Sequence, residues 1–222
     1  AFIGIGEKGK SNKIYYIGSK EPKPLKEFLE IILNQSKRLI NLVENVLNVA
    51  KIDSNSTDLI LSKVEINKLM QNCISMLKIA NPNFEFLYQA SKTDLNSLCD
   101  MDKTQQVIIN ILDNAIKYSI DSNQVMIHNF NEGDYNVISI KNFGNYIEDE
   151  QKEKIFEKFY RVDSYIQTST QGSGLGLYIA KSLIEKMNGF IKLNSSKEEK
   201  WVEFLIYLPV YEVEKLTKNI GV

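Results

Sequence analysis

The chain carries almost no net charge. Its 222 residues include 27 Lys and Arg against 28 Asp and Glu, which leaves a net charge of −1. A protein that binds nucleic acid or an anionic membrane through charge needs an excess of basic residues on one surface. We therefore expect no nucleic-acid partner.

Long apolar runs and cysteines are also scarce. No stretch reaches the roughly 20 apolar residues that span a bilayer, and the N-terminus lacks the basic-then-apolar pattern of a signal peptide. The two cysteines, Cys73 and Cys99, are far apart and form no zinc pattern. We expect a soluble segment with two buried free thiols in a reducing cytoplasm.

The first 20 residues contain two β-type runs, at residues 2–5 and 14–17. They predict a hairpin, or the end of an upstream domain, over residues 1–20. Residues 4–11 also satisfy the G-x-x-x-x-G-K-S pattern of a phosphate-binding P-loop, which requires a helix after it. The β-type residues that follow Ser11 favour a hairpin turn instead.

Residues 25–53 predict one long stem helix. Apolar side chains recur at alternating steps of three and four over residues 25–49, with Gln35 filling one slot of the heptad repeat. Further apolar residues widen the stripe beyond the seam between two helices. Because the sequence has no second helix of this kind, we expect a homodimer through residues 25–52.

The pattern changes after residue 57. Helices are expected near 66–80, 101–117 and 174–188, the last one closed by Gly189. Strands are expected near 58–62, 84–89, 124–130, 135–142, 190–195 and 201–208, with a short one ending at Cys99. This predicts an α+β fold, a two-layer α/β sandwich with one helix layer on a mixed sheet, over residues 58–210, and a tail over 211–222.

Two asparagines on the helix near 101–117 are the first candidate site residues. Asn110 and Asn114 are four residues apart and share one helix face, and Lys117 and Tyr118 follow. Amide oxygens are acceptable ligands for Mg²⁺. This face can serve Mg²⁺ and phosphate, although two asparagines on a helix are more often only a solvated face.

Three alternating glycines are the second candidate. Gly172, Gly174 and Gly176 open the last helix, with Leu175 and Leu177 among them. Glycines let the backbone approach a ligand closely, and the free N–H groups of a helix N-terminus favour phosphate. The spacing is not that of a dinucleotide fingerprint, and a flexible hinge is the alternative.

Arg161 is the third candidate. It is one of only two arginines in a chain that otherwise uses lysine, and its planar guanidinium suits phosphate. An ordinary surface arginine is the alternative. Phe156 and Phe159, just before it, are expected to anchor this loop in the core.

Taken in order, these residues resemble a known family. Four motifs are similar to the N, G1, F and G2 boxes of the ATP-binding catalytic domain of sensor histidine kinases. In order, they contain Asn110 and Asn114, Asn142 and Gly144, Phe156 and Phe159, and Gly172 and Gly176. This domain belongs to the gyrase, chaperone and histidine kinase ATPase superfamily. The match covers about residues 58–210. The helix over 25–52 resembles the second helix of that family's dimerisation and phosphoacceptor stem.

The resemblance implies ATP and Mg²⁺ as ligands, and it implies roles for the matching residues. Asn114 would ligate Mg²⁺ with support from Asn110, and Lys117 and Arg161 would contact phosphates. Tyr118, Asn142, Gly144 and Ile147 would surround the adenine. Residues 148–171 would form a mobile lid over the nucleotide. The hinge of this lid and the loop around the phosphates would consist of Gly172, Gly174, Leu175, Gly176 and Leu177.

Three departures from the family pattern matter. Asn142 replaces an aspartate that accepts from the adenine amine, which should weaken adenine binding by about 1 kcal/mol. Tyr146 replaces the second glycine of that box and can reshape the pocket. The His-Glu phosphoacceptor motif is absent, and the single histidine, His128, lies in a predicted strand.

Two hypotheses follow from this resemblance. The first is a two-component histidine kinase module, a cytoplasmic part of a sensor, that transfers the γ-phosphoryl of Mg-ATP to a histidine outside this chain and serves a response regulator. A histidine-bearing stem helix would be its second partner. The alternative is a degenerate, non-catalytic module that binds nucleotide or a partner kinase. A gyrase-like ATPase is disfavoured because Asn110 stands where those enzymes are expected to carry a general-base glutamate.

Overall fold

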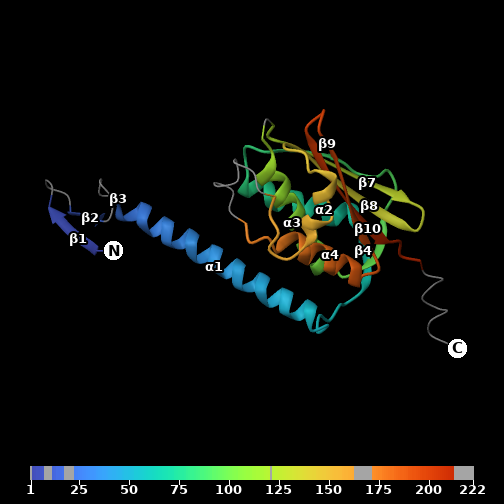
Figure 1. Ribbon diagram of the computed structural model, residues 1–222, viewed down its shortest axis with the longest axis horizontal. Helices are drawn as coiled ribbons and strands as arrows, with labels where there is room; N and C mark the ends of the chain where they lie inside the picture. Colours follow the sequence, from blue (N-terminus) through green and yellow to red (C-terminus); the bar gives the residue numbers. More distant parts are fainter. Residues whose placement is uncertain (1, 8–11, 18–22, 121, 163–171, 213–222) are drawn as a thin grey trace. The chain divides into compact units, whose positions relative to one another are not determined.

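The computed structural model describes residues 2–7, 12–17, 23–120, 122–162 and 172–212. The chain divides into two compact units, Ala1–Leu47 and Asn48–Val222. Figure 1 shows the elements of both units.

The first unit begins with a small antiparallel sheet. Its strands are β1 (Phe2–Glu7), β2 (Asn12–Ile17) and β3 (Lys23–Pro24), in the order β1-β2-β3. β1 pairs with β2 from Phe2 opposite Ile17 to Glu7 opposite Asn12, which confirms the predicted hairpin; residues 8–11 lie outside the described part. The P-loop interpretation is wrong, because a strand stands where a P-loop requires a helix.

A single helix, α1 (Leu25–Asp53), forms over the residues for which one long helix was predicted. The structure describes α1 in full, and none of its residues is buried. Ten of its large apolar side chains are exposed: Leu29, Ile31, Ile32, Leu33, Leu39, Ile40, Leu42, Val43, Val46 and Leu47. An apolar stripe of this width is typical of a helix that needs partner helices.

The second unit is built on a five-stranded mixed sheet. Its strands are β5 (Glu85–Gln89), β7 (Gln124–Glu132), β8 (Tyr135–Phe143), β9 (Phe190–Ser196) and β10 (Trp201–Pro209), in the order β5-β7-β8-β10-β9. β5 pairs with β7 in parallel, and the other neighbours are antiparallel. The strands β4 (Ser62–Glu65) and β6 (Asn96–Cys99) form a separate pair.

Three helices cover one face of this sheet (Figure 1): α2 (Ile66–Ala80), α3 (Met101–Tyr118) and α4 (Gly176–Lys186). Two short 3₁₀ turns, η1 (Asp149–Gln151) and η2 (Lys154–Phe156), precede α4. Each helix buries one apolar stripe, formed in α3 by Val107, Ile108, Ile111, Leu112 and Ala115. These stripes and alternate residues of the strands form one core, which confirms the two-layer α+β sandwich.

The first strand of this unit lies further along the chain than expected. Residues 58–62 were expected to form a strand because they are apolar, but β4 begins at Ser62. Ile60 is 80% exposed, and its N–H donates to Oδ2 of Asp100 at 2.8 Å rather than to a neighbouring strand. The carboxylate of Asp100 thus accepts from a backbone N–H for which the sequence pattern predicted a partner in a neighbouring strand.

The end of α4 also differs from expectation. Gly189 was expected to close the helix, but the residue with left-handed backbone is Asn188, with φ of 59°. Asparagine tolerates this region, and it allows the N–H of Gly189 to donate to the carbonyl of Ile184 at 2.9 Å. Glycine is needed at 189 for another reason, because a Cβ there would lie 2.1 Å from the carbonyl oxygen of Tyr207.

Cys73 and Cys99 are buried free thiols, as predicted, and burial raises the pKa of both to about 11. His128 lies on β7, with its ring 5.2 Å from that of Phe130. None of the helices in the described ranges combines the length and apolar composition needed to cross a bilayer.

Asp100 ties α3 to the segment that follows α1, and we predict that Asp100→Ala destabilises the protein. Its two carboxylate oxygens accept from the N–H groups of Lys103 (3.0 Å) and Ile60 (2.8 Å). The variant loses an N-cap and a partly buried tether, so the free energy of unfolding should fall by about 2 kcal/mol. Urea titration followed by circular dichroism measures this change.

The matched control is Asp102→Ala, which removes an exposed acidic residue from the same helical turn. It should cost about 0.5 kcal/mol through the helix dipole alone. Equal losses for both variants would contradict the tether.

Candidate functional site

The contact between α3 and the start of α4 is the first element of the site. Asn110 is half-buried on α3, and its Nδ2 donates to the carbonyl of Gly176 at 3.5 Å. Asn114, one turn later, is half-buried and forms no side-chain hydrogen bond with any described residue. Asn110 therefore contacts the predicted glycine run at Gly176, and Asn114 lies one turn further along α3.

The glycine run is packed against the turn after η2. Gly174 has φ of +70°, and a Cβ there would lie 2.8 Å from two backbone atoms of Phe159. The N–H of Phe159 also donates to the carbonyl of Gly174 at 3.0 Å. Only glycine fits this approach, because a side chain would meet both strain and a clash.

The two phenylalanines of that turn behave differently. Phe156 is buried and meets the ring of Phe204 edge-on at 6.3 Å, as predicted. The prediction for Phe159 is wrong, because its side chain is 65% exposed. Its backbone, with φ of 64°, forms the contact with Gly174 and leaves the ring in solvent.

Backbone amides are available where α4 begins. Leu175 precedes the helix and provides no side-chain cap for it, so the N–H groups of the first turn have no intrahelical partner. Leu175 is buried and Leu177 packs against the core, which fixes the direction of the helix. A Cβ at Gly172 would meet nothing within 4 Å. The first turn of α4 is therefore suited to an anion.

A buried amide lies at the end of β8. Asn142 is 3% exposed, and its side chain forms no hydrogen bond with any described residue. A ligand that supplies a donor and an acceptor would satisfy this amide.

Gly144, two residues later, joins the end of β8 to the end of α3. A Cβ at Gly144 would lie 2.1 Å from the carbonyl oxygen of Tyr118 and 3.6 Å from Nδ2 of Asn142. Ser119 forms an isolated bridge with Gly144, and the N–H of Gly144 donates to the carbonyl of Lys200 at 2.8 Å. The buried amide is thus held beside the C-terminal turn of α3.

Tyr146 and Ile147, which follow Gly144 in the sequence, form contacts away from this amide. Ile147 packs against the core, and its carbonyl accepts from Oγ of Ser195 at 2.7 Å. The hydroxyl of Tyr146 donates to Glu148 at 2.7 Å, and Nζ of Lys197 lies 5.1 Å from its ring centre. The polar end of Tyr146 is therefore engaged by Glu148 rather than by Asn142.

The remaining predicted residues lie at the surface. Tyr118, Lys117 and Arg161 are exposed. Burial raises the pKa of the Asp113 carboxyl, and the charge of Lys117 partly offsets this rise. Residues 163–171 of the predicted lid lie outside the described part.

The described residues contain no cluster of three or more His, Cys, Asp or Glu side chains that could hold a metal ion. A metal at this site would depend on amide oxygens and on oxygens of a ligand. The half-buried, unbonded side chain of Asn114 fits that role, because its carbonyl is a hard oxygen donor.

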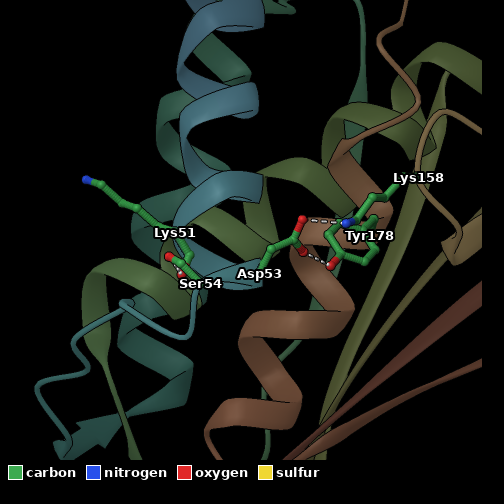
Figure 2. Close-up of polar contacts among 5 residues, drawn as sticks. All are labelled: Lys51, Asp53, Ser54, Lys158 and Tyr178. Carbon is green, nitrogen blue, oxygen red and sulfur yellow. Dashed lines mark hydrogen bonds and ion pairs between the residues drawn. The ribbon is translucent and has the colours of Figure 1, made fainter.

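One contact of this region could not be found from sequence patterns. Asp53, the last residue of α1, bonds both Lys158, beside Phe159, and Tyr178, on α4 (Figure 2). Lys158 and Tyr178 are separated from Asp53 by 105 and 125 positions in the sequence, so no local pattern predicts that the three side chains meet.

Comparison with known proteins decides the family. A family model described as histidine kinase-, DNA gyrase B- and HSP90-like ATPase matches residues 99–212. The chain belongs to this ATPase family. The match begins at the end of β6 and includes the site elements described above except Asp53.

The relatives of this ATPase chain are histidine kinases. It is 34% identical over 187 residues to the signal transduction histidine-protein kinase ArlS of Staphylococcus haemolyticus, covering 84% of this chain and 41% of that protein. The chain therefore spans less than half the length of this relative. ArlS of Staphylococcus aureus is 32% identical over the same length.

Solved structures support the same assignment. The catalytic domain of histidine kinase ThkA is 29% identical with a TM-score of 0.58, covering 68% of this chain and 96% of that one. ThkA in complex with the response regulator protein TrrA is 27% identical with a TM-score of 0.66, covering 87% of this chain and 53% of that one. The second unit is a histidine kinase ATP-binding catalytic domain.

We predict that Gly144→Ala destabilises this domain, because the new Cβ would lie 2.1 Å from a backbone oxygen. The free energy of unfolding should fall by about 3 kcal/mol, the upper part of the range for overpacking. Urea unfolding measures the loss. Gly172→Ala is the control, since its Cβ meets nothing within 4 Å; it should change stability by less than about 0.5 kcal/mol. Similar losses for both would show that the approach of Gly144 to Tyr118 is not a tight constraint.

Proposed function

We propose that the chain is the ATP-binding part of a two-component sensor histidine kinase. It binds Mg-ATP and transfers the γ-phosphoryl group to a histidine that lies outside this sequence. In this transfer a bond forms between phosphorus and an imidazole nitrogen, the bond from phosphorus to the bridging oxygen breaks, and ADP leaves. The observation that carries the proposal is the buried, unbonded amide of Asn142 beside Gly144.

The adenine would bind at the end of β8. Asn142 can accept from the amine of the base and donate to a ring nitrogen, so one ligand would satisfy both ends of its amide. Gly144 leaves no side chain beside it, and Tyr118 and Ile147 would border the base. An aspartate in place of Asn142 would add charge to the contact with the amine, so this amide would bind adenine less tightly.

The phosphates would bind between α3 and the start of α4. The amides of Gly174 and Gly176 lie next to an uncapped helix N-terminus, where negative charge is favoured, while the N–H of the intervening Leu175 donates to Oγ of Ser173 at 3.3 Å. Lys117 and Arg161 would add positive charge. Asn114 would hold Mg²⁺ with support from Asn110, and the ion would shield the phosphate charges during transfer.

The partners are proposed on the same basis. The exposed apolar stripe of α1 supports a homodimer through residues 25–52, in a bundle with histidine-bearing stem helices. The ThkA structure contains a response regulator, which supports a response regulator as the partner here. We place this part of the protein in the cytoplasm, where ATP and response regulators occur.

A non-catalytic module is the second candidate, favoured by one observation. Asn142 carries no charge where the family is expected to have an aspartate, so adenine binding would be weaker. A chain that binds nucleotide but phosphorylates no supplied stem domain would support this candidate over the kinase.

Calorimetric titration with a non-hydrolysable ATP analogue tests nucleotide binding directly. We expect saturable binding that Mg²⁺ strengthens by about tenfold, and Asn114→Ala should abolish the Mg²⁺ effect because the variant lacks the amide ligand. Asn41→Ala, which removes an exposed asparagine from α1, is the control and should keep the full effect. Absence of binding at millimolar nucleotide would overturn the proposal.

We also predict that Asn142→Asp tightens ADP binding by about fivefold, because the hydrogen bond to the amine becomes charge-assisted. The same change places an unpaired carboxylate in a buried position, so the free protein should unfold at a lower temperature. Calorimetry and thermal unfolding measure the two effects.

Asn136→Asp is the matched control. Asn136 is buried on the same strand but bonds Asn96 and Ser97, so its replacement should lower stability without changing ADP affinity. Tighter ADP binding in both variants would argue against adenine recognition by Asn142.

A further inference from the structure

Asp53 uses both oxygens of its carboxylate. Oδ2 accepts from Nζ of Lys158 at 2.6 Å, and Oδ1 accepts from the hydroxyl of Tyr178 at 2.8 Å. Figure 2 shows the carboxylate with its bonds to the two side chains. All three residues belong to the unit Asn48–Val222, so this is a contact within one compact body.

The two partners of Asp53 lie on the two segments that form the proposed phosphate site. Lys158 precedes Phe159, whose N–H donates to the carbonyl of Gly174. Tyr178 lies in the first turn of α4, two residues after Gly176. Nζ of Lys158 also lies 4.9 Å from the ring centre of Tyr178. Asp53 therefore connects the turn that supports the glycine run to the helix that the run begins.

The position of Asp53 is itself well fixed. Val49 and Ile52, in the last turn and a half of α1, pack against the core. Asn55, just after the helix, accepts from Nζ of Lys186 at the far end of α4. The carboxylate is thus presented from a segment that is held at both sides.

The charges reinforce this geometry. Hydrogen bonds from Lys158 and then Tyr178 lower the pKa of Asp53, and the bond to Asp53 raises the pKa of Lys158. Both groups are therefore ionised at neutral pH. Charge-assisted bonds of this kind are shorter and stronger than neutral ones, although partial exposure reduces their contribution.

We propose that Asp53 is a positioning residue for phosphate binding: it holds the Lys158 turn and the first turn of α4 in the relative position that the phosphate-binding amides require. The proposal rests on the proposed function, because it assigns the phosphates to the Gly174–Gly176 amides. It adds that the C-terminal end of the stem helix is part of the nucleotide site, through a side chain that touches no nucleotide.

A purely structural contact would have a different signature. Its loss would change the stability of the whole domain and lower the affinity for all nucleotides alike. Loss of a positioning contact would lower the affinity for each ligand according to how much its binding depends on the phosphate-binding amides. The affinity for adenosine, which would bind only at the Asn142 end, would not change.

The test compares the binding of a non-hydrolysable ATP analogue with that of adenosine in Asp53→Ala, measured by calorimetry on the full chain with Mg²⁺. We expect affinity for the analogue to fall by roughly fivefold, the effect of losing one partly exposed charge-assisted contact. Affinity for adenosine should stay the same, and Asp53→Glu should recover part of the loss. Tyr178→Phe, which keeps the ring, should reproduce part of the effect.

The control is Glu185→Gln. Glu185 is an exposed acidic residue of α4 whose carboxylate forms no ion pair or hydrogen bond with the described residues. It should leave both affinities unchanged. The double variant Asp53→Ala with Tyr178→Phe should lose no more than Asp53→Ala alone, because both changes remove one shared contact.

Hydrogen exchange in the absence of nucleotide separates this proposal from the proposed function. Asp53→Ala should speed amide exchange in peptides covering 154–162 and 172–180, and leave β7 and β8 unchanged. If the unmodified chain binds no nucleotide, the proposed function fails, and faster exchange in these two peptides still supports the positioning contact. If the chain binds nucleotide but Asp53→Ala keeps the same ratio of analogue to adenosine affinity, or exchange does not change in either peptide, the proposal is overturned.

Discussion

The packing of α3 against the sheet and against the neighbouring α4 is the constraint on which the rest of this domain depends. Its apolar stripe, which includes Ile108 and Ile111, fills the centre of the core. Beside this stripe, Asn110 contacts Gly176 at the start of α4, and Asn114 lies one turn further along the helix. Because core packing fixes the rotation of the helix, one set of buried side chains orients the site residues beside it. The helix therefore supplies both stability and the geometry of the proposed Mg²⁺ site.

The two ends of α3 are fixed in different ways, and both matter to the site. At the N-terminus, Asp100 caps the helix and holds the segment after α1. At the C-terminus, Gly144 lies so close to Tyr118 that no side chain is possible. That approach also places Asn142 beside the last turn of the helix. Because this side-chain amide has no partner among the described residues, a ligand can complete its hydrogen bonding.

Most of the fold and the order of the site segments could be predicted, because both follow from local patterns in the sequence. Heptad spacing predicts α1, period-two alternation predicts the strands, and spaced glycines predict the start of α4. The failures concern positions that depend on distant partners. The backbone of Ile60 bonds a side chain 40 residues away, and Phe159 is exposed because its backbone meets Gly174. Asp53 belongs to no motif at all, since its partners come together only in the folded domain.

The apolar side chains of α1 are exposed along most of the helix and pack against the core only near its C-terminal end. Up to Leu47 its apolar side chains are exposed, as expected for a helix that packs on other helices. From Asn48 onward it belongs to the ATPase unit, through the packing of Val49 and Ile52 and the bonds of Asp53. Asp53 therefore lies within the ATPase unit, where its carboxylate joins the Lys158 turn to the first turn of α4.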